Sequence, residues 1–201
     1  MASSAFEIPL RRLRSEMAWL CVEFKRAANV PATRQTQLTC EMAVIRMHDS
    51  WARFCREIII LSAFGNTITL SGIPLTRSRP DIDTLGSVIP VLLRLKRSSV
   101  EPRWANAYAC IDAARNLSIR NFSTVVAAIG ATNSPADALR HARNFYAHRG
   151  KETSKLAIST GNFVSTNYPL IYDLNAYTKG GLTLIESWVK EFDIVAVASI
   201  Q

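Results

Sequence analysis

The sequence predicts an all-α fold, on three observations. Apolar residues recur every three to four positions through most of the chain, which is the period of an amphipathic helix. Glycine and proline gather chiefly in two stretches, residues 65–83 and 161–181. The 201 residues are 48% hydrophobic and 20% charged, as in globular proteins. A chain of this length can bury one sizeable core, so we expect a single domain over residues 1–201.

The N-terminal part predicts two long helices. Apolar residues at spacings of three and four begin at Ile8, and Asn29-Val30-Pro31 ends the pattern, so a first helix is expected over about 5–29. A second pattern covers about 33–64, as one helix or as two with a kink near 48–50. Its apolar positions include Leu38, Met42, Ile45, Trp51, Phe54, Ile58 and Leu61.

The stretch 65–83 interrupts the helical pattern. It contains two prolines and an alternating segment at 67–70, which indicates a loop with at most one short strand. A loop of this length is either an ordinary insertion or a lid over a site. Helical patterns resume at about 84–96, 102–118, 121–131, 135–149, 151–160 and 182–199, while 161–181 is irregular.

The charge is strongly basic, and it is concentrated upstream of residue 150. The net charge is +8, and residues 1–150 alone hold 20 Lys and Arg against 11 Asp and Glu. Such an excess suits an acidic partner, for which RNA or DNA is the usual candidate, or else it is a solvated basic surface. Eighteen of the 24 cations are arginine, whose planar fork suits phosphate.

Several other classes of protein are disfavoured. The four cysteines form no C-x-x-C pair and no zinc spacing, so we expect buried, reduced thiols in a cytoplasmic protein with no metal and no cofactor. The start shows no secretory signal, and no apolar run approaches the length of a membrane span. Glycine-rich phosphate loops, G-x-S-x-G and H-E-x-x-H are absent from the sequence.

The helix expected at 135–149 carries the most informative segment, RNFYAHRG at 143–150. Ser134 and Pro135 are typical of a helix start, and Gly150 of a helix end. Leu139, Ala142 and Tyr146 are expected to face the core. His141, Asn144 and His148 follow one another at spacings of three and four and so share a stripe, whereas Arg143 lies about 140° around the helix from His148.

These residue types can cleave RNA. Cleavage needs a base for the ribose 2′-hydroxyl, a proton donor for the leaving oxygen and positive charge on the phosphate. His148 lies in the last helical turn, where the helix dipole favours imidazolium, and is the expected acid–base. Arg143 would bind and stabilise the phosphate. Asn144 would orient either His148 or Arg143. One copy offers one such histidine, so two copies meeting in a two-fold dimer would complete the chemistry more easily.

The segment resembles the R-x4-H motif of the HEPN superfamily, and HDSWARFCRE at 48–57 is similar to the opening helix of its RiboL-PSP-type members from bacterial defence and toxin systems. The resemblance covers about 45–200 as a fold and 143–150 as chemistry. It implies an HEPN-like helical bundle that acts as a metal-independent endoribonuclease through a composite site at a homodimer interface. It also implies an antitoxin or regulatory partner, in a toxin–antitoxin or antiviral setting.

Plainer interpretations stay open. His148 is otherwise a surface histidine, and Arg143 otherwise pairs with Asp137 or Glu152. Further candidate substrate contacts, each with a core or solvated alternative, are His141, Tyr146, Arg149, Arg53 and Arg56. The second functional hypothesis is a non-catalytic helical module that binds nucleic acid or protein and uses the same helix as a dimer seam. An antitoxin or immunity subunit is the third.

Overall fold

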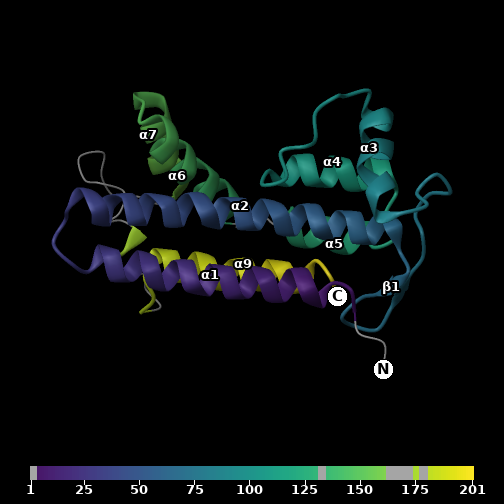
Figure 1. Ribbon diagram of the computed structural model, residues 1–201, viewed down its shortest axis with the longest axis horizontal. Helices are drawn as coiled ribbons and strands as arrows, with labels where there is room; N and C mark the ends of the chain where they lie inside the picture. Colours follow the sequence, from purple (N-terminus) through teal and green to yellow (C-terminus); the bar gives the residue numbers. More distant parts are fainter. Residues whose placement is uncertain (1–3, 131–134, 162–173, 177–180) are drawn as a thin grey trace. The chain divides into compact units, whose positions relative to one another are not determined.

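The computed structural model describes residues 4–130, 135–161, 174–176 and 181–201 (Figure 1). The described chain is mostly helical, as the periodicity predicts. It divides into two compact units. The first unit comprises Met1–Leu13, Trp51–Ser134 and Ile194–Gln201, and the second comprises Arg14–Ser50 and Pro135–Asp193. Three long helices contribute residues to both units.

The two long N-terminal helices are confirmed. Helix α1 spans Glu7–Ala28 and helix α2 spans Arg34–Phe64, without a break at residues 48–50. Glu7 lies in the first turn of α1 and Lys25 and Arg26 lie in its last, so the charges oppose the helix dipole at both ends.

In the C-terminal half of α2 the predicted apolar positions Trp51, Phe54 and Ile58 are buried, but the buried face of its N-terminal half differs from the one that the pattern suggests. Leu38 and Met42 are 43% and 52% exposed. The core of the second unit instead takes four smaller or more flexible side chains of α2, which are Cys40, Ala43, Val44 and Met47. Positions 40, 44 and 47 form a stripe of their own, and positions 38 and 42 point to another side of the helix.

The first unit contains the interruption predicted after α2. Strands β1 (Thr67–Ile68) and β2 (Pro74–Leu75) form a two-stranded antiparallel hairpin, so this stretch has two short strands where the sequence predicts at most one, near 67–70. A 3-10 turn η1 (Leu85–Ser87) leads into α3 (Val88–Lys96). Helices α4 (Ala107–Leu117) and α5 (Phe122–Ile129) follow. Helix α4 begins later than predicted because the Asn106 side chain caps it, accepting a 2.9 Å hydrogen bond from the Ala109 amide.

The second unit contains α6 (Ala136–His148) and α7 (Lys151–Gly161), which lie against each other, together with most of α9 (Leu184–Ala198). The left-handed residue that caps the C-terminus of α6 is Arg149, with φ 44°, and not Gly150 as predicted. Ser134, the predicted cap of α6, lies outside the described residues, as does most of the irregular 161–181 stretch.

The predicted burial of the cysteines is confirmed. All four cysteines are buried and unpaired, and the tryptophans at 51, 104 and 188 are 1%, 8% and 5% exposed. Burial raises the pKa of the Cys40 thiol to about 11, which keeps this thiol protonated and unreactive near neutral pH. Among the described residues, no helix is both long and apolar enough to cross a bilayer.

Candidate functional site

Helix α6 runs antiparallel to α2 within the second unit. The guanidinium of Arg149, just after the end of α6, forms an ion pair with Glu41 of α2. Near the middle of α6, Arg143 and Arg140 act electrostatically on His48 of α2. Glu41 and His48 are seven residues apart, which is about 10 Å along one face of a helix. The pattern of contacts therefore places the motif helix beside the stretch of α2 that ends at His48.

The core face of α6 agrees with the sequence. Leu139 is 1% exposed, Ala142 is fully buried and Tyr146 is 8% exposed. His141, expected on the stripe of Asn144 and His148, is also buried, at 8% exposure. Exposure rises along that stripe, because Asn144 is half-buried and His148 is exposed.

Arg143 is half-buried and only partly bonded. Its Nη1 donates a 3.4 Å hydrogen bond to the side-chain oxygen of the neighbouring Asn144. Within the described residues, its buried Nε has no hydrogen-bond partner and the guanidinium forms no ion pair. The two carboxylates considered for it are engaged elsewhere, since Asp137 pairs with Arg140 and Glu152 with Lys155. A half-buried guanidinium with spare donors is suited to an anionic ligand.

His48 is the residue that α2 brings to this arginine. Its side chain is 16% exposed, and its Nδ1 lies 3.3 Å from the Asp49 carboxylate. Burial lowers the pKa of His48, the Asp49 carboxylate opposes this shift, and the nearby Arg143 and Arg140 lower the pKa further. The neutral imidazole is thereby favoured, and a neutral imidazole can accept a proton.

A second histidine belongs to the same helix. The His141 Nε2 lies 3.1 Å from a terminal nitrogen of Arg140, and Arg140 is held by Asp137 at 3.0 Å. Burial lowers the pKa of His141, and the Arg140 charge lowers it further. The second unit thus contains all three histidines of the chain, and two of them are favoured in the neutral form.

His148 stands apart from this group. It is the last residue of α6 and is exposed, and it lies five positions after Arg143. Among the described residues, no hydrogen bond joins His148 to Arg143 or to Asn144. A single chain therefore brings together Arg143, Asn144 and His48, and leaves His148 on the adjacent surface.

The remaining candidates divide between the units. Arg53 and Arg56 belong to the first unit. Arg53 is exposed, and Arg56 forms two hydrogen bonds of 2.8 and 3.2 Å with the carboxylate of Glu101. Glu101 also accepts from the Trp104 indole at 3.0 Å, which fixes Arg56 in a structural network. Among the described side chains, His, Cys, Asp and Glu do not gather in threes as a metal site would need.

Comparison of the chain with protein-family models, with curated proteins and with solved structures found no match.

Sequence reasoning placed the phosphate-binding role on α6 and missed His48. Position 48 appears in the sequence only as the start of the segment similar to an HEPN opening helix. The sequence contains one signal for His48. Glu41 and His48 share a face of α2, and the basic end of α6 is complementary to Glu41, so pairing of these charges would bring α6 to the face that carries His48.

Proposed function

We propose that this chain is a metal-independent endoribonuclease with an HEPN-like site, acting as a homodimer in the cytoplasm. Arg143 binds and stabilises the scissile phosphate, and Asn144 orients the Arg143 guanidinium. His148 is the general acid–base contributed at the dimer interface. His48 adds a neutral imidazole on the Arg143 side of the same chain. A nuclease of this kind would need an antitoxin or regulatory partner, as in toxin–antitoxin and antiviral systems.

The observation that supports the proposal is the state of Arg143. Arginines that serve structure are usually held by a carboxylate, as Arg56 is by Glu101. Arg143 instead keeps unused donors beside a histidine whose pKa is lowered, chiefly by burial. A phosphate bound there would satisfy the guanidinium, and the added negative charge would raise the pKa of His48 and favour proton uptake.

The exposed position of His148 favours one alternative, a helical module that binds RNA without cleaving it. Arg143 would then hold phosphate while His148 played no part. The two functions differ in a single requirement, because binding does not need His148 whereas cleavage does.

The test is to incubate the purified chain with labelled total RNA and tRNA in EDTA, beside His148→Ala and Arg143→Ala. Removing an acid–base group is expected to lower the cleavage rate by about 10²–10⁴-fold, and removing a charge at the phosphate by about 10²–10³-fold. Lys155→Ala is the matched control, since it removes an exposed cation of α7 that pairs with Glu152. The binding module would be favoured if none of the four proteins cleaves RNA, His148→Ala and Lys155→Ala bind it as the parent does, and Arg143→Ala binds it more weakly.

A mixing experiment tests the composite site. If His148 acts across a dimer interface, combining inactive Arg143→Ala with inactive His148→Ala should restore part of the activity, because mixed dimers contain one intact combination. Mixing has no effect if each chain cleaves by itself.

A further inference from the structure

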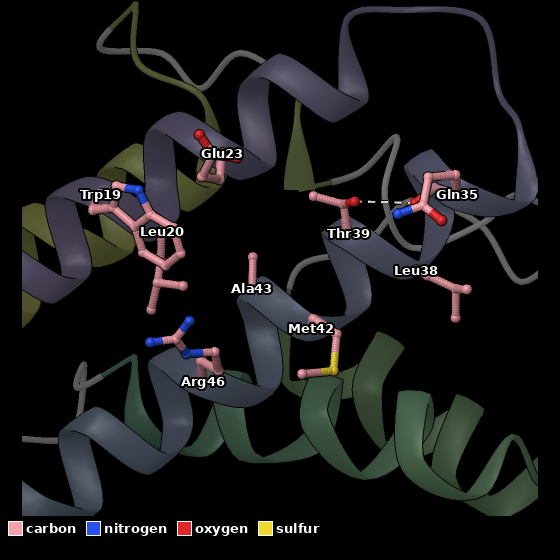
Figure 2. A pocket seen from close by; sticks show the side chains of 9 residues that line it. All are labelled: Trp19, Leu20, Glu23, Gln35, Leu38, Thr39, Met42, Ala43 and Arg46. Carbon is pink, nitrogen blue, oxygen red and sulfur yellow. Dashed lines mark hydrogen bonds between the residues drawn. The ribbon is translucent and has the colours of Figure 1, made fainter.

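A hollow between α1 and α2 in the second unit is lined by residues of both helices and has a volume of about 240 Å³ (Figure 2). Its lining residues are Trp19, Leu20, Glu23, Gln35, Leu38, Thr39, Met42, Ala43 and Arg46. Ligand pockets for drug-sized molecules usually measure about 300–1,000 Å³, so this hollow suits a single ring system.

Trp19 forms one wall of the hollow and is unusual among the tryptophans. It is 49% exposed, whereas the other three are at most 8% exposed. The Arg46 guanidinium lies over the Trp19 ring, 4.9 Å from the ring centre, and Glu16 holds Arg46 at 3.3 Å. Aromatic rings and guanidinium planes are the groups on which unpaired nucleobases stack.

The rest of the hollow is complementary to a flat heterocycle. Figure 2 shows Trp19, Arg46, Met42 and Thr39 around the small side chain of Ala43, which leaves room above the buried base of the hollow. Leu38 and Met42 supply apolar contact, although both are exposed. A polar rim consists of Glu23, Gln35 and Thr39. A nucleobase has the matching features, namely two apolar faces and an edge of donors and acceptors.

The charges near the hollow admit a phosphate backbone. Arg26 follows the lining residue Glu23 by one turn and keeps 74% of its side chain exposed. Arg34, next to Gln35 at the start of α2, is exposed as well. Arg46 pairs with Glu16 and Glu23 pairs with Arg26 itself, so the hollow favours a neutral group, and the exposed Arg34 adds a positive charge beside it.

We propose that this hollow binds an unpaired nucleobase of single-stranded RNA, with the base stacked against Trp19 and the backbone near Arg26 and Arg34. The choice of RNA rests on the proposed function, and the choice of a nucleobase rests on the shape and chemistry of the hollow. Stacking on one aromatic side chain typically contributes a five- to hundredfold gain in affinity, on the order of 1–3 kcal/mol.

The experiment is a fluorescence titration of the whole chain with a 2′-O-methylated RNA of about ten nucleotides, a common site size for single strands. This RNA cannot be cleaved through its 2′-oxygen, so binding is measured whether or not the chain is a nuclease. Stacking should quench the Trp19 emission. The change can be assigned to Trp19 because the other tryptophans are buried and out of reach of the RNA. Trp19→Leu should weaken binding roughly tenfold, measured by anisotropy of a labelled RNA, and Trp19→Phe should restore part of it.

Two controls isolate the base. Val22→Ala changes a 62% exposed apolar residue of α1 that does not line the hollow, and it should leave affinity unchanged. An abasic strand of the same length should bind the parent about as weakly as the normal strand binds Trp19→Leu. This control changes the RNA and leaves the protein unaltered.

The proposal is wrong if abasic and normal strands bind equally, or if Trp19→Leu binds as the parent does. Quenching by AMP without any binding of RNA would overturn the assignment to RNA, and Trp19-dependent dimerisation without either ligand would assign the hollow to a second copy. Loss of the base site with cleavage intact would leave the nuclease proposal standing. Base binding without cleavage would support the base site and count against the nuclease proposal.

Discussion

Gly65, which follows the last residue of α2, is expected to tolerate no side chain. Its φ is +69°, a conformation that residues with a Cβ seldom adopt. A Cβ built on Gly65 would lie 2.3 Å from the Thr76 carbonyl carbon and 2.4 Å from the Arg77 nitrogen. Both neighbours are backbone atoms, so no rotamer change can make room. The close approach holds the end of α2 against the strand segment that leaves the hairpin.

The cost of Gly65→Ala has two parts. The left-handed conformation costs about 1–2 kcal/mol for a residue with a Cβ. Forcing an atom into a packed position typically costs a further 1–3 kcal/mol or so. The free energy of unfolding should therefore fall by about 3 kcal/mol. For a chain of this size that corresponds to a melting temperature lower by roughly 6–12 °C.

Two other glycines separate these contributions. Gly72 has φ +82° and open space around its Cβ position, so Gly72→Ala should show the conformational cost alone, about 1–2 kcal/mol. Gly86 lacks the positive φ and its nearest neighbour would be 3.7 Å away, so Gly86→Ala should be neutral or slightly stabilising. Urea unfolding of the three variants measures the series. Equal losses for Gly65→Ala and Gly72→Ala would refute the close approach to Thr76.

Three further predictions follow from the second unit. Glu186 accepts from Lys25 and Thr183, which lowers the pKa of Glu186 to about 2. A group with a lowered pKa stabilises the fold at any pH above its ordinary pKa, here near 4.5. Glu186→Gln should therefore lower the free energy of unfolding at pH 7. The difference from the parent should vanish as the pH falls toward 2. Arg143→Gln should raise the pKa of His48, seen by NMR titration of the imidazole, while Lys155→Gln should not. Leu139→Ala should cost about 3 kcal/mol by urea unfolding, and exposed Ala147→Ser close to nothing.

The sequence predicts where the helices lie better than which way they face. Helix boundaries follow from local signals, such as Asn29-Val30-Pro31 after α1, and these signals act within a few residues. The core face depends on the neighbours of a helix. In α2 the pattern through Leu38 and Met42 predicts a helix correctly, yet both side chains are exposed because the packing uses the stripe of Cys40, Val44 and Met47. That choice of stripe also creates the hollow beside Trp19.

In the candidate site, too, local spacing predicts some features, and others depend on the neighbouring helix. The spacing within α6 correctly places Leu139, Ala142 and Tyr146 in the core and separates Arg143 from His148. Sequence spacing cannot show which helix lies against Arg143. His48 is 95 positions away in the chain, and only the pairing of α6 with α2 brings it near. Arg149, the left-handed residue after α6, likewise has a distant partner, since its guanidinium pairs with Glu41.

The arrangement constrains how the proposed nuclease would work. Five residues of helix separate Arg143 from His148 by about 7.5 Å along the axis and about 140° around it. Arg143 and His148 of one helix therefore lie on different faces. A phosphate bound on the His48 side of Arg143 is out of reach of His148 from the same helix. If catalysis needs both histidines at one phosphate, His48 belongs to the chain that supplies Arg143 and the acting His148 belongs to its partner. Adding His48→Ala to the Arg143→Ala chain of a mixed dimer should then leave the recovered activity unchanged, because both losses fall on the half of the site that is already inactive. Placing His48→Ala in the His148→Ala chain instead should abolish recovery, since that chain supplies the only intact arginine.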